Sequence, residues 1–166
     1  LFVDKGSRAN VLPGQVVVDD SGVVGQVTRV YPWLSEVTLV TDKDHAVPIQ
    51  SVRNGLRAVV FGSGDTGEMA LRYMPMSSDI VVGDVLVTSG IDGTYPPNLP
   101  VAQVTRIERD PAYPFARITC APMAGVDRNR ALLIVSGLPN LPERPESAET
   151  NADPERAKKR LKRRKP

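Results

Sequence analysis

The chain has 166 residues, of which 41% are hydrophobic and 24% are charged, with 15 prolines and 13 glycines. This apolar content is enough for a packed core, and so many prolines and glycines argue against a helical bundle. Residues 1–138 contain 12 basic and 14 acidic side chains, whereas residues 139–166 contain 9 basic and 5 acidic ones. The longer part therefore has no basic stripe, and no nucleic-acid partner is expected.

The chain contains no run of 18 apolar residues and no signal-peptide pattern. Because it does not begin with Met, we expect it to be a fragment, and a membrane anchor could precede Leu1. The single cysteine, Cys120, excludes an intrachain disulfide. It lies in a strand-like segment, which predicts a small buried hydrophobic side chain.

Short segments rich in β-branched residues alternate with turn residues through the first 135 positions. No window repeats its apolar residues with the period of a helix, so the sequence predicts an all-β fold. Pro48 cannot donate to a sheet ladder and should lie in an edge strand or at a strand end. Eleven strands are predicted, over residues 1–4, 14–18, 23–30, 36–40, 46–49, 57–61, 69–73, 85–88, 100–107, 116–120 and 131–135.

Residues 13–30 (PGQVVVDDSGVVGQVTRV) and 82–107 (VGDVLVTSGIDGTYPPNLPVAQVTRI) share one pattern of strand, turn and strand. Their second strands, VGQVTRV and VAQVTRI, have five identical residues. The offset is 69 residues at the opening glycines and 77 at the second strand, mainly because the second copy contains the insert 91–99. We infer an internal duplication.

The two halves are predicted to be domains of residues 1–74 and 75–138. Neither half can bury a large core alone, so we expect two small β-barrels of six-stranded type that pack on each other. Barrel closure removes strand edges that would otherwise recruit partners. Residues 139–166 are rich in proline and charge and poor in large apolar groups, which predicts a disordered basic tail.

Glycine and serine mark the tight turns between the strands, since these residues tolerate backbone angles that others avoid. The glycine-rich run GSGDTG at 62–67 lacks the Lys-Ser/Thr of a phosphate-binding loop, so it is interpreted as a turn and no cofactor is expected. The structural turn residues are predicted to be Gly6, Gly14, Gly22, Gly83, Ser89 and Gly90.

His45 is the only histidine, and it lies in a turn rich in aspartate. A serine hydrolase would need it beside a serine such as Ser51, Ser63 or Ser89. No motif singles out any of these residues, so we predict no catalytic residue and keep a protease-like hydrolase as an alternative. One histidine and one cysteine far apart in the sequence do not have the spacing of zinc ligands, so no metal site is predicted.

Two predicted loops present aromatic and apolar side chains that could either cap the barrel ends or bind a partner protein. A further alternative is a polyanion-binding or membrane-surface module that acts through eight basic residues in 156–165. The candidate partner contacts are Tyr31, Trp33, Leu34, Tyr95 and Leu99.

Four blocks carry a family resemblance: VDKGSRANV (3–11), GVVGQV (22–27), VGDVLVTSGIDGTYPPNLPVAQV (82–104) and RALLIV (130–135). In this order they resemble the rod shape-determining family MreC. RNG (53–55), RAVVFGSGD (57–65) and MPMSSDIVVGD (74–84) fit the same pattern. The resemblance covers residues 1–136 and leaves the tail outside.

The resemblance implies two β-barrels without a catalytic triad, preceded in the full protein by a transmembrane helix and a coiled coil. It implies a non-enzymatic scaffold of the elongasome, anchored in the bacterial inner membrane with this region on the periplasmic side. The implied role is to maintain rod shape by organising peptidoglycan synthesis. The implied partners are further copies of the chain, the class B penicillin-binding protein of elongation, MreD and MreB.

Overall fold

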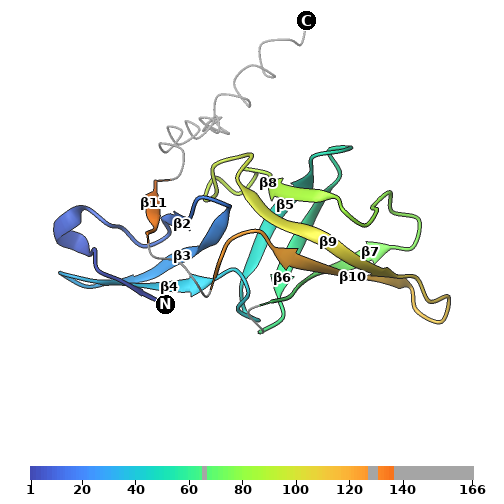
Figure 1. Cartoon of the computed structure of the whole chain (residues 1–166), viewed down its shortest axis with the longest axis horizontal. Coiled ribbons are helices and arrows are strands. Elements are labelled where there is room, and N and C mark those ends of the chain that lie inside the picture. Colours follow the sequence, from blue (N-terminus) through green and yellow to red (C-terminus); the bar gives the residue numbers. More distant parts are fainter. Residues whose placement is uncertain (65–66, 127–130, 137–166) are drawn as a thin grey trace, which may run out of the picture.

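The computed structural model describes residues 1–64, 67–126 and 131–136. The predicted disordered tail, and the polyanion-binding role that rests on it, lie outside these residues. The described part is built from short strands and one 3-10 helix (Figure 1). The elements are β1 (Phe2–Val3), η1 (Ser7–Ala9), β2 (Val16–Val18), β3 (Val23–Val30), β4 (Ser35–Leu39), β5 (Ala46–Ser51), β6 (Arg57–Gly62), β7 (Met69–Pro75), β8 (Val85–Thr88), β9 (Pro100–Glu108), β10 (Phe115–Pro122) and β11 (Leu133–Val135).

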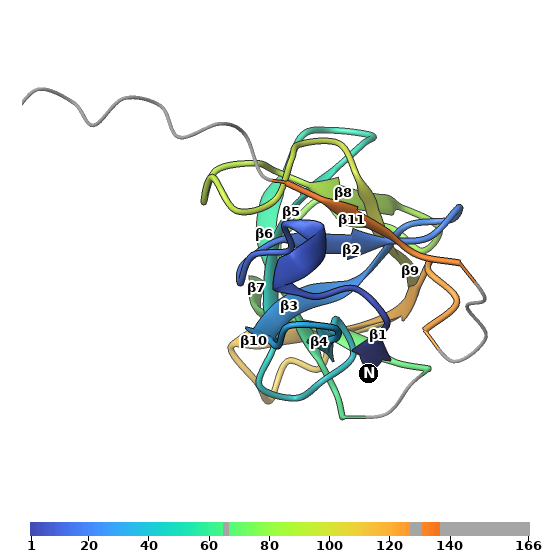
Figure 2. The same cartoon turned by 90° about the vertical axis from the view of Figure 1, so that its left-hand side faces the viewer.

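The strands form two sheets that lie one after the other along the long axis of the molecule (Figure 1). Six strands, in the order β10-β7-β6-β5-β8-β9, form a closed barrel. Five strands, in the order β1-β4-β3-β2-β11, form a second sheet, which we call the open sheet. Figure 2 shows this sheet from its end, curled between β1 and β11. The predicted all-β fold is confirmed, and each predicted strand coincides with an observed one.

The two sheets do not follow the predicted division into residues 1–74 and 75–138. Strands β5, β6 and β7 all begin before residue 75, yet they belong to the closed barrel. Conversely, β11 lies at the end of the described chain but joins the open sheet. Sheet membership depends on pairing between distant residues, and the local patterns used for the prediction do not encode that pairing.

The sequence repeat is also a repeat of strand register. Val18 pairs with Val23 in the hairpin β2-β3, and Val87 pairs with Pro100 in the hairpin β8-β9. Both hairpins contain a register shift immediately before this pair. The third strands match as well, because β3 and β4 pair with the same offset and the same irregularity as β9 and β10. The two halves therefore share a three-stranded unit, β2-β3-β4 and β8-β9-β10.

Equivalent hydrogen bonds open the two units. The amide of Gly14 donates to Val27 O at 2.8 Å, and the amide of Gly83 donates to Val104 O at 2.8 Å. The side chain of Gln26 donates to Gly14 O, as Gln103 donates to Gly83 O. Both glycines have positive φ, +89° and +94°. The backbone conformation of the turn has thus been kept together with its glycine.

The strand that follows each three-stranded unit in the chain joins the sheet of the other unit. Strand β5 follows the first unit but pairs with β8, where Gln50 lies opposite Val87. Strand β11 follows the second unit but pairs with β2, where Leu133 lies opposite Val18. Because Val18 and Val87 are equivalent positions, β5 and β11 fill equivalent places. We call this arrangement the strand exchange.

The equivalence also explains why one sheet is closed and the other is open. Strand β1 lies beside β4 as β7 lies beside β10, but no described strand takes the place of β6. A groove of about 500 Å³ lies there, between the residues of β1 and those of β11. Leu1 is 49% exposed in this groove, whereas its barrel counterpart Met69 is fully buried.

The two sheets share one continuous hydrophobic core, in which valine predominates. They also touch through their turns. A Cβ on Gly22 would lie only 2.6 Å from Pro100 O, so glycine lets the first hairpin approach the start of β9. The carboxylate of Asp19 accepts a hydrogen bond of 2.7 Å from the amide of Gly125. Cys120 is fully buried in this core, as predicted.

We predict that Gly14→Ala and Gly83→Ala each lower the free energy of unfolding by about 1–2 kcal/mol, because an L side chain is disfavoured at positive φ. A Cβ at either position would meet no heavy atom closer than 4.0 Å, so backbone strain alone is tested. Urea denaturation measures both losses. Gly67→Ala is the control, since Gly67 has open space and no positive φ. Clearly unequal losses at Gly14 and Gly83 would contradict their structural equivalence.

Candidate functional site

Residues 31–34 connect β3 to β4 at one end of the molecule (Figure 1). The side chains of Tyr31, Trp33 and Leu34 are all exposed there. Trp33 is 68% exposed, and the guanidinium carbon of Arg8 lies 4.1 Å from the centroid of its ring system. We call these four side chains the tip surface.

The backbone beneath the tip surface is held by hydrogen bonds. The amide of Tyr31 donates to Leu34 O at 2.9 Å and closes the turn. Helix η1 packs on the same turn, because the amide of Ser7 donates to Tyr31 O at 2.9 Å. A Cβ on Gly6 would lie only 2.0 Å from Tyr31 O, so glycine is required for this approach.

The tip surface has the composition of a protein-binding site. Tryptophan, tyrosine and arginine supply most of the energy in typical interfaces, because each buries a large area and retains a polar group. Here a cation–π contact holds Arg8 over Trp33 before any partner binds. A preorganised pair loses less side-chain entropy on binding than two free side chains would.

Tyr95 and Leu99 do not belong to this surface, which corrects the prediction for them. Tyr95 is only 2% exposed, and its hydroxyl lies 2.7 Å from Nε2 of His45. Leu99 is half-buried and packs against the core. The insert 91–99 turns these two side chains inward, so they stabilise the fold, whereas Ile91 of the same insert is 66% exposed.

His45 is buried beside Tyr95. Burial lowers the pKa of its imidazole, and the nearby negative charge of Asp42 partly opposes that shift. The hydrolase alternative would need a serine at His45 Nε2, but the tyrosine hydroxyl occupies that position. Within the described residues, no group of three or more His, Cys, Asp and Glu side chains is arranged to hold a metal ion.

A second exposed aromatic group was missed by the sequence analysis. Tyr73, Tyr113 and Phe115 lie on the outside of the closed barrel. Strand alternation would turn Tyr73 inward beside the outward Arg72, but an irregularity in the pairing of β7 with β10 leaves both side chains exposed. A bulge of this kind has no reliable sequence signal, although the two prolines of loop 110–114 mark the region as irregular.

The model of the family "Rod shape-determining protein MreC, barrel core" matches residues 1–136. The chain belongs to the MreC family. The cell shape-determining protein MreC of Escherichia coli is 44% identical over 137 residues, which cover 82% of this chain and 37% of that protein. MreC of Haemophilus influenzae is 38% identical over 135 residues, covering 81% of this chain and 38% of its own length.

Solved MreC structures have the same fold. The crystal structure of MreC from Pseudomonas aeruginosa matches with a TM-score of 0.78 and 42% identity, over 81% of this chain and 86% of that one. A complex between PBP2 and MreC from Helicobacter pylori matches with a TM-score of 0.61 and 20% identity, over 78% of this chain and 83% of that one. The chain spans less than two fifths of the length of the two curated relatives.

We predict that the chain becomes less stable as the pH falls from 7.5 to 5.5. The folded state lowers the pKa of His45, so the unfolded state binds a proton more readily below its own pKa of about 6.5. The loss should approach at most about 1.4 kcal/mol per pH unit. Thermal unfolding at several pH values measures it.

His45→Gln is the matched variant for this measurement, because glutamine keeps a polar group beside the Tyr95 hydroxyl without a titration in this range. Asp79 and Asp84, whose pKa values are lowered by Arg53, affect stability only in more acidic solution. An equal pH dependence in His45→Gln and in the original chain would show that His45 is not the source.

Proposed function

We propose that the chain is part of a non-catalytic scaffold that maintains rod shape by binding the class B penicillin-binding protein of elongation. The observation that carries this proposal is the exposed and preorganised tip surface in a chain of the MreC family. The complex of PBP2 with an MreC of the same fold from Helicobacter pylori supports the choice of partner.

In this proposal the scaffold acts through binding energy alone. A partner can be activated by a scaffold only if the scaffold binds its active conformation more tightly than its inactive one. Tyr31, Trp33 and Leu34 would supply the contacts, since large and rigid side chains bind at low entropic cost. The hydrogen-bonded turn beneath them would keep the contact geometry fixed.

The remaining parts of the proposal concern the full protein. We place this region on the periplasmic side of the bacterial inner membrane, anchored by a segment that precedes it. In the described residues, no helix has the length and apolar character needed to cross a membrane. Further copies of the chain, MreD and MreB are the other proposed members of the assembly.

The proposal is tested by measuring binding to the purified periplasmic region of the cognate class B penicillin-binding protein. We expect Trp33→Ala to weaken binding about tenfold or more, because a central tryptophan is lost from the contact. Biolayer interferometry gives the dissociation constants. Ile91→Ala is the control, since it removes an exposed apolar side chain that is not part of the tip surface.

The two ways of failing are distinct. Absence of binding by the unchanged chain would overturn the choice of partner. Binding that survives Trp33→Ala and Leu34→Ala unchanged would keep the partner but remove the tip surface from the contact.

A further inference from the structure

The closed barrel carries an exposed apolar surface of its own. It consists of outward side chains from three neighbouring strands and one loop, which we call the barrel face. Most of these side chains are aromatic, and the charged one is an arginine. The barrel face comprises Val59 and Phe61 of β6, Arg72 and Tyr73 of β7, Phe115 of β10 and Tyr113 of the preceding loop.

Tyr73 occupies this surface in an unfavourable backbone conformation. Its φ is +60°, and it is 71% exposed. The other described non-glycine residues with positive φ are Asn10 and Asn98, and asparagine tolerates that region far better than a bulky residue. Strain of this kind at a solvent-exposed ring points to a role outside the fold.

The barrel face is concave beside Tyr73. A groove of about 530 Å³ runs between β7 and the β9–β10 connection. Tyr73 and Phe115 line it and meet edge to face, with ring centroids 5.9 Å apart. Tyr113 lines the same groove. A groove of this size with aromatic walls suits one or two apolar side chains of an extended segment.

The groove is lined by two basic side chains, Arg72 and Arg117, and by two acidic ones, Glu108 and Asp110, which already have partners. Glu108 is already paired with Arg106 at 3.0 Å and faces Arg117 at 3.9 Å. The carboxylate of Asp110 accepts a hydrogen bond from the amide of Ala112 and so stabilises the turn that contains both residues. Within the described part of the chain, Arg72 has no acidic partner and instead lies 4.7 Å over the ring of Phe61.

We propose that the barrel face is a second docking site, which receives a segment of a partner protein that carries an apolar anchor flanked by carboxylates. The anchor would enter the groove beside the paired rings of Tyr73 and Phe115, and the carboxylates would pair with Arg72 and Arg117. Arginine is suited to this, because its planar guanidinium can bind a carboxylate through two hydrogen bonds.

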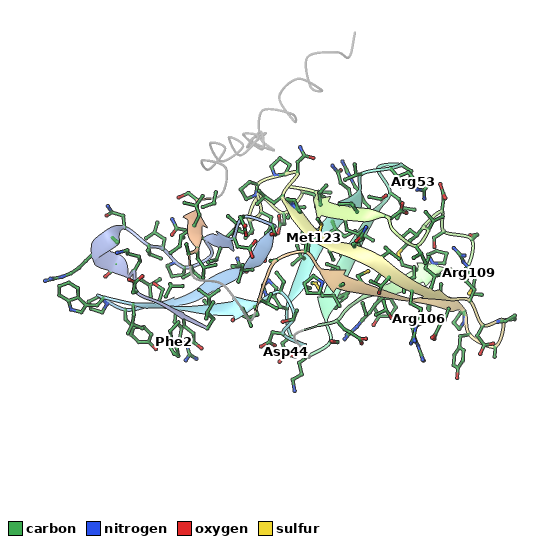
Figure 3. The ribbon with its side chains drawn as sticks, in the orientation of Figure 1. Phe2, Asp44, Arg53, Arg106, Arg109 and Met123 are labelled. Carbon is green, nitrogen blue, oxygen red and sulfur yellow. The ribbon has the colours of Figure 1, made fainter. Side chains whose placement is uncertain are left out.

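Charge argues against the tip surface of a second copy as the occupant. The tip surface presents Arg8 over Trp33, so docking it here would bring guanidinium groups together. The two surfaces also lie toward opposite ends of the molecule. Figure 3 shows Phe2 toward one end, where β1 lies beside β4, and Arg106 and Arg109 toward the other. Both surfaces can therefore be occupied at the same time.

The test uses the hexapeptide Glu-Glu-Phe-Leu-Glu-Glu, acetylated and amidated, as a probe of this chemistry. Backbone amide shifts of the chain are followed during titration, and the peptide with lysine in place of glutamate is the charge control. We expect saturable shifts confined to residues 59–61, 70–73 and 113–117, with a dissociation constant below about 1 mM. The lysine peptide should not bind.

Two variants separate binding from folding. Tyr73→Asn removes the ring and relieves the strain, so it should leave thermal stability unchanged or higher while it weakens peptide binding about tenfold. Arg72→Glu should weaken binding at least as much, and the effect should shrink at high salt. Trp33→Ala is the matched control at the opposite end and should bind normally.

The proposal is overturned if the acidic peptide causes no saturable shifts at about 1 mM, if the shifts lie elsewhere, or if the lysine peptide binds equally well. Concentration-dependent shifts at the barrel face without peptide would identify a second copy as the occupant and would also overturn it. None of these results depends on whether the penicillin-binding protein contacts the tip surface.

Discussion

The strand exchange is the constraint on which the rest of the structure depends. Because β5 pairs with β8 and β11 pairs with β2, each sheet is completed by residues from the other half of the chain. Neither three-stranded unit can form its complete sheet from its own half. The shared core adds to this dependence, since buried side chains of both sheets form one cluster. The two sheets should therefore unfold as one cooperative unit.

Local features of this fold could be predicted from the sequence, and long-range ones could not. The strands and the repeat were predictable because valine-rich segments and turn glycines act locally. The membership of β5 in the closed barrel could not be predicted, because the pairing of Gln50 with Val87 joins residues that no nearby sequence pattern connects. Pro48 illustrates both the local and the long-range features. It lies within the barrel sheet but just beyond the last residue pair of β5 with β8, where an amide donor is not needed.

The same distinction explains the outcome for the candidate site. Residues 31–34 lie in a short loop between paired strands, so exposure of their rings follows from local geometry. Tyr95 looked similar in the sequence, but its partner His45 lies 50 residues away in the chain, and the resulting hydrogen bond turns it inward. Tyr73 was missed for a related reason. Its outward direction results from a pairing irregularity between β7 and β10, which depends on both strands.

The strand exchange has a mechanical consequence for the proposed scaffold. The two sheets are joined by two chain connections, from β4 to β5 and from β10 to β11, and by the shared core. A pull applied between the two ends acts on both connections, and the pairs β5-β8 and β11-β2 hold the strands to which they lead. Hinge motion between the sheets is opposed by the two connections and by the shared core. A body joined in this way acts as a stiff spacer rather than a flexible tether. Proteins bound at its two ends would keep a fixed separation and a fixed mutual orientation.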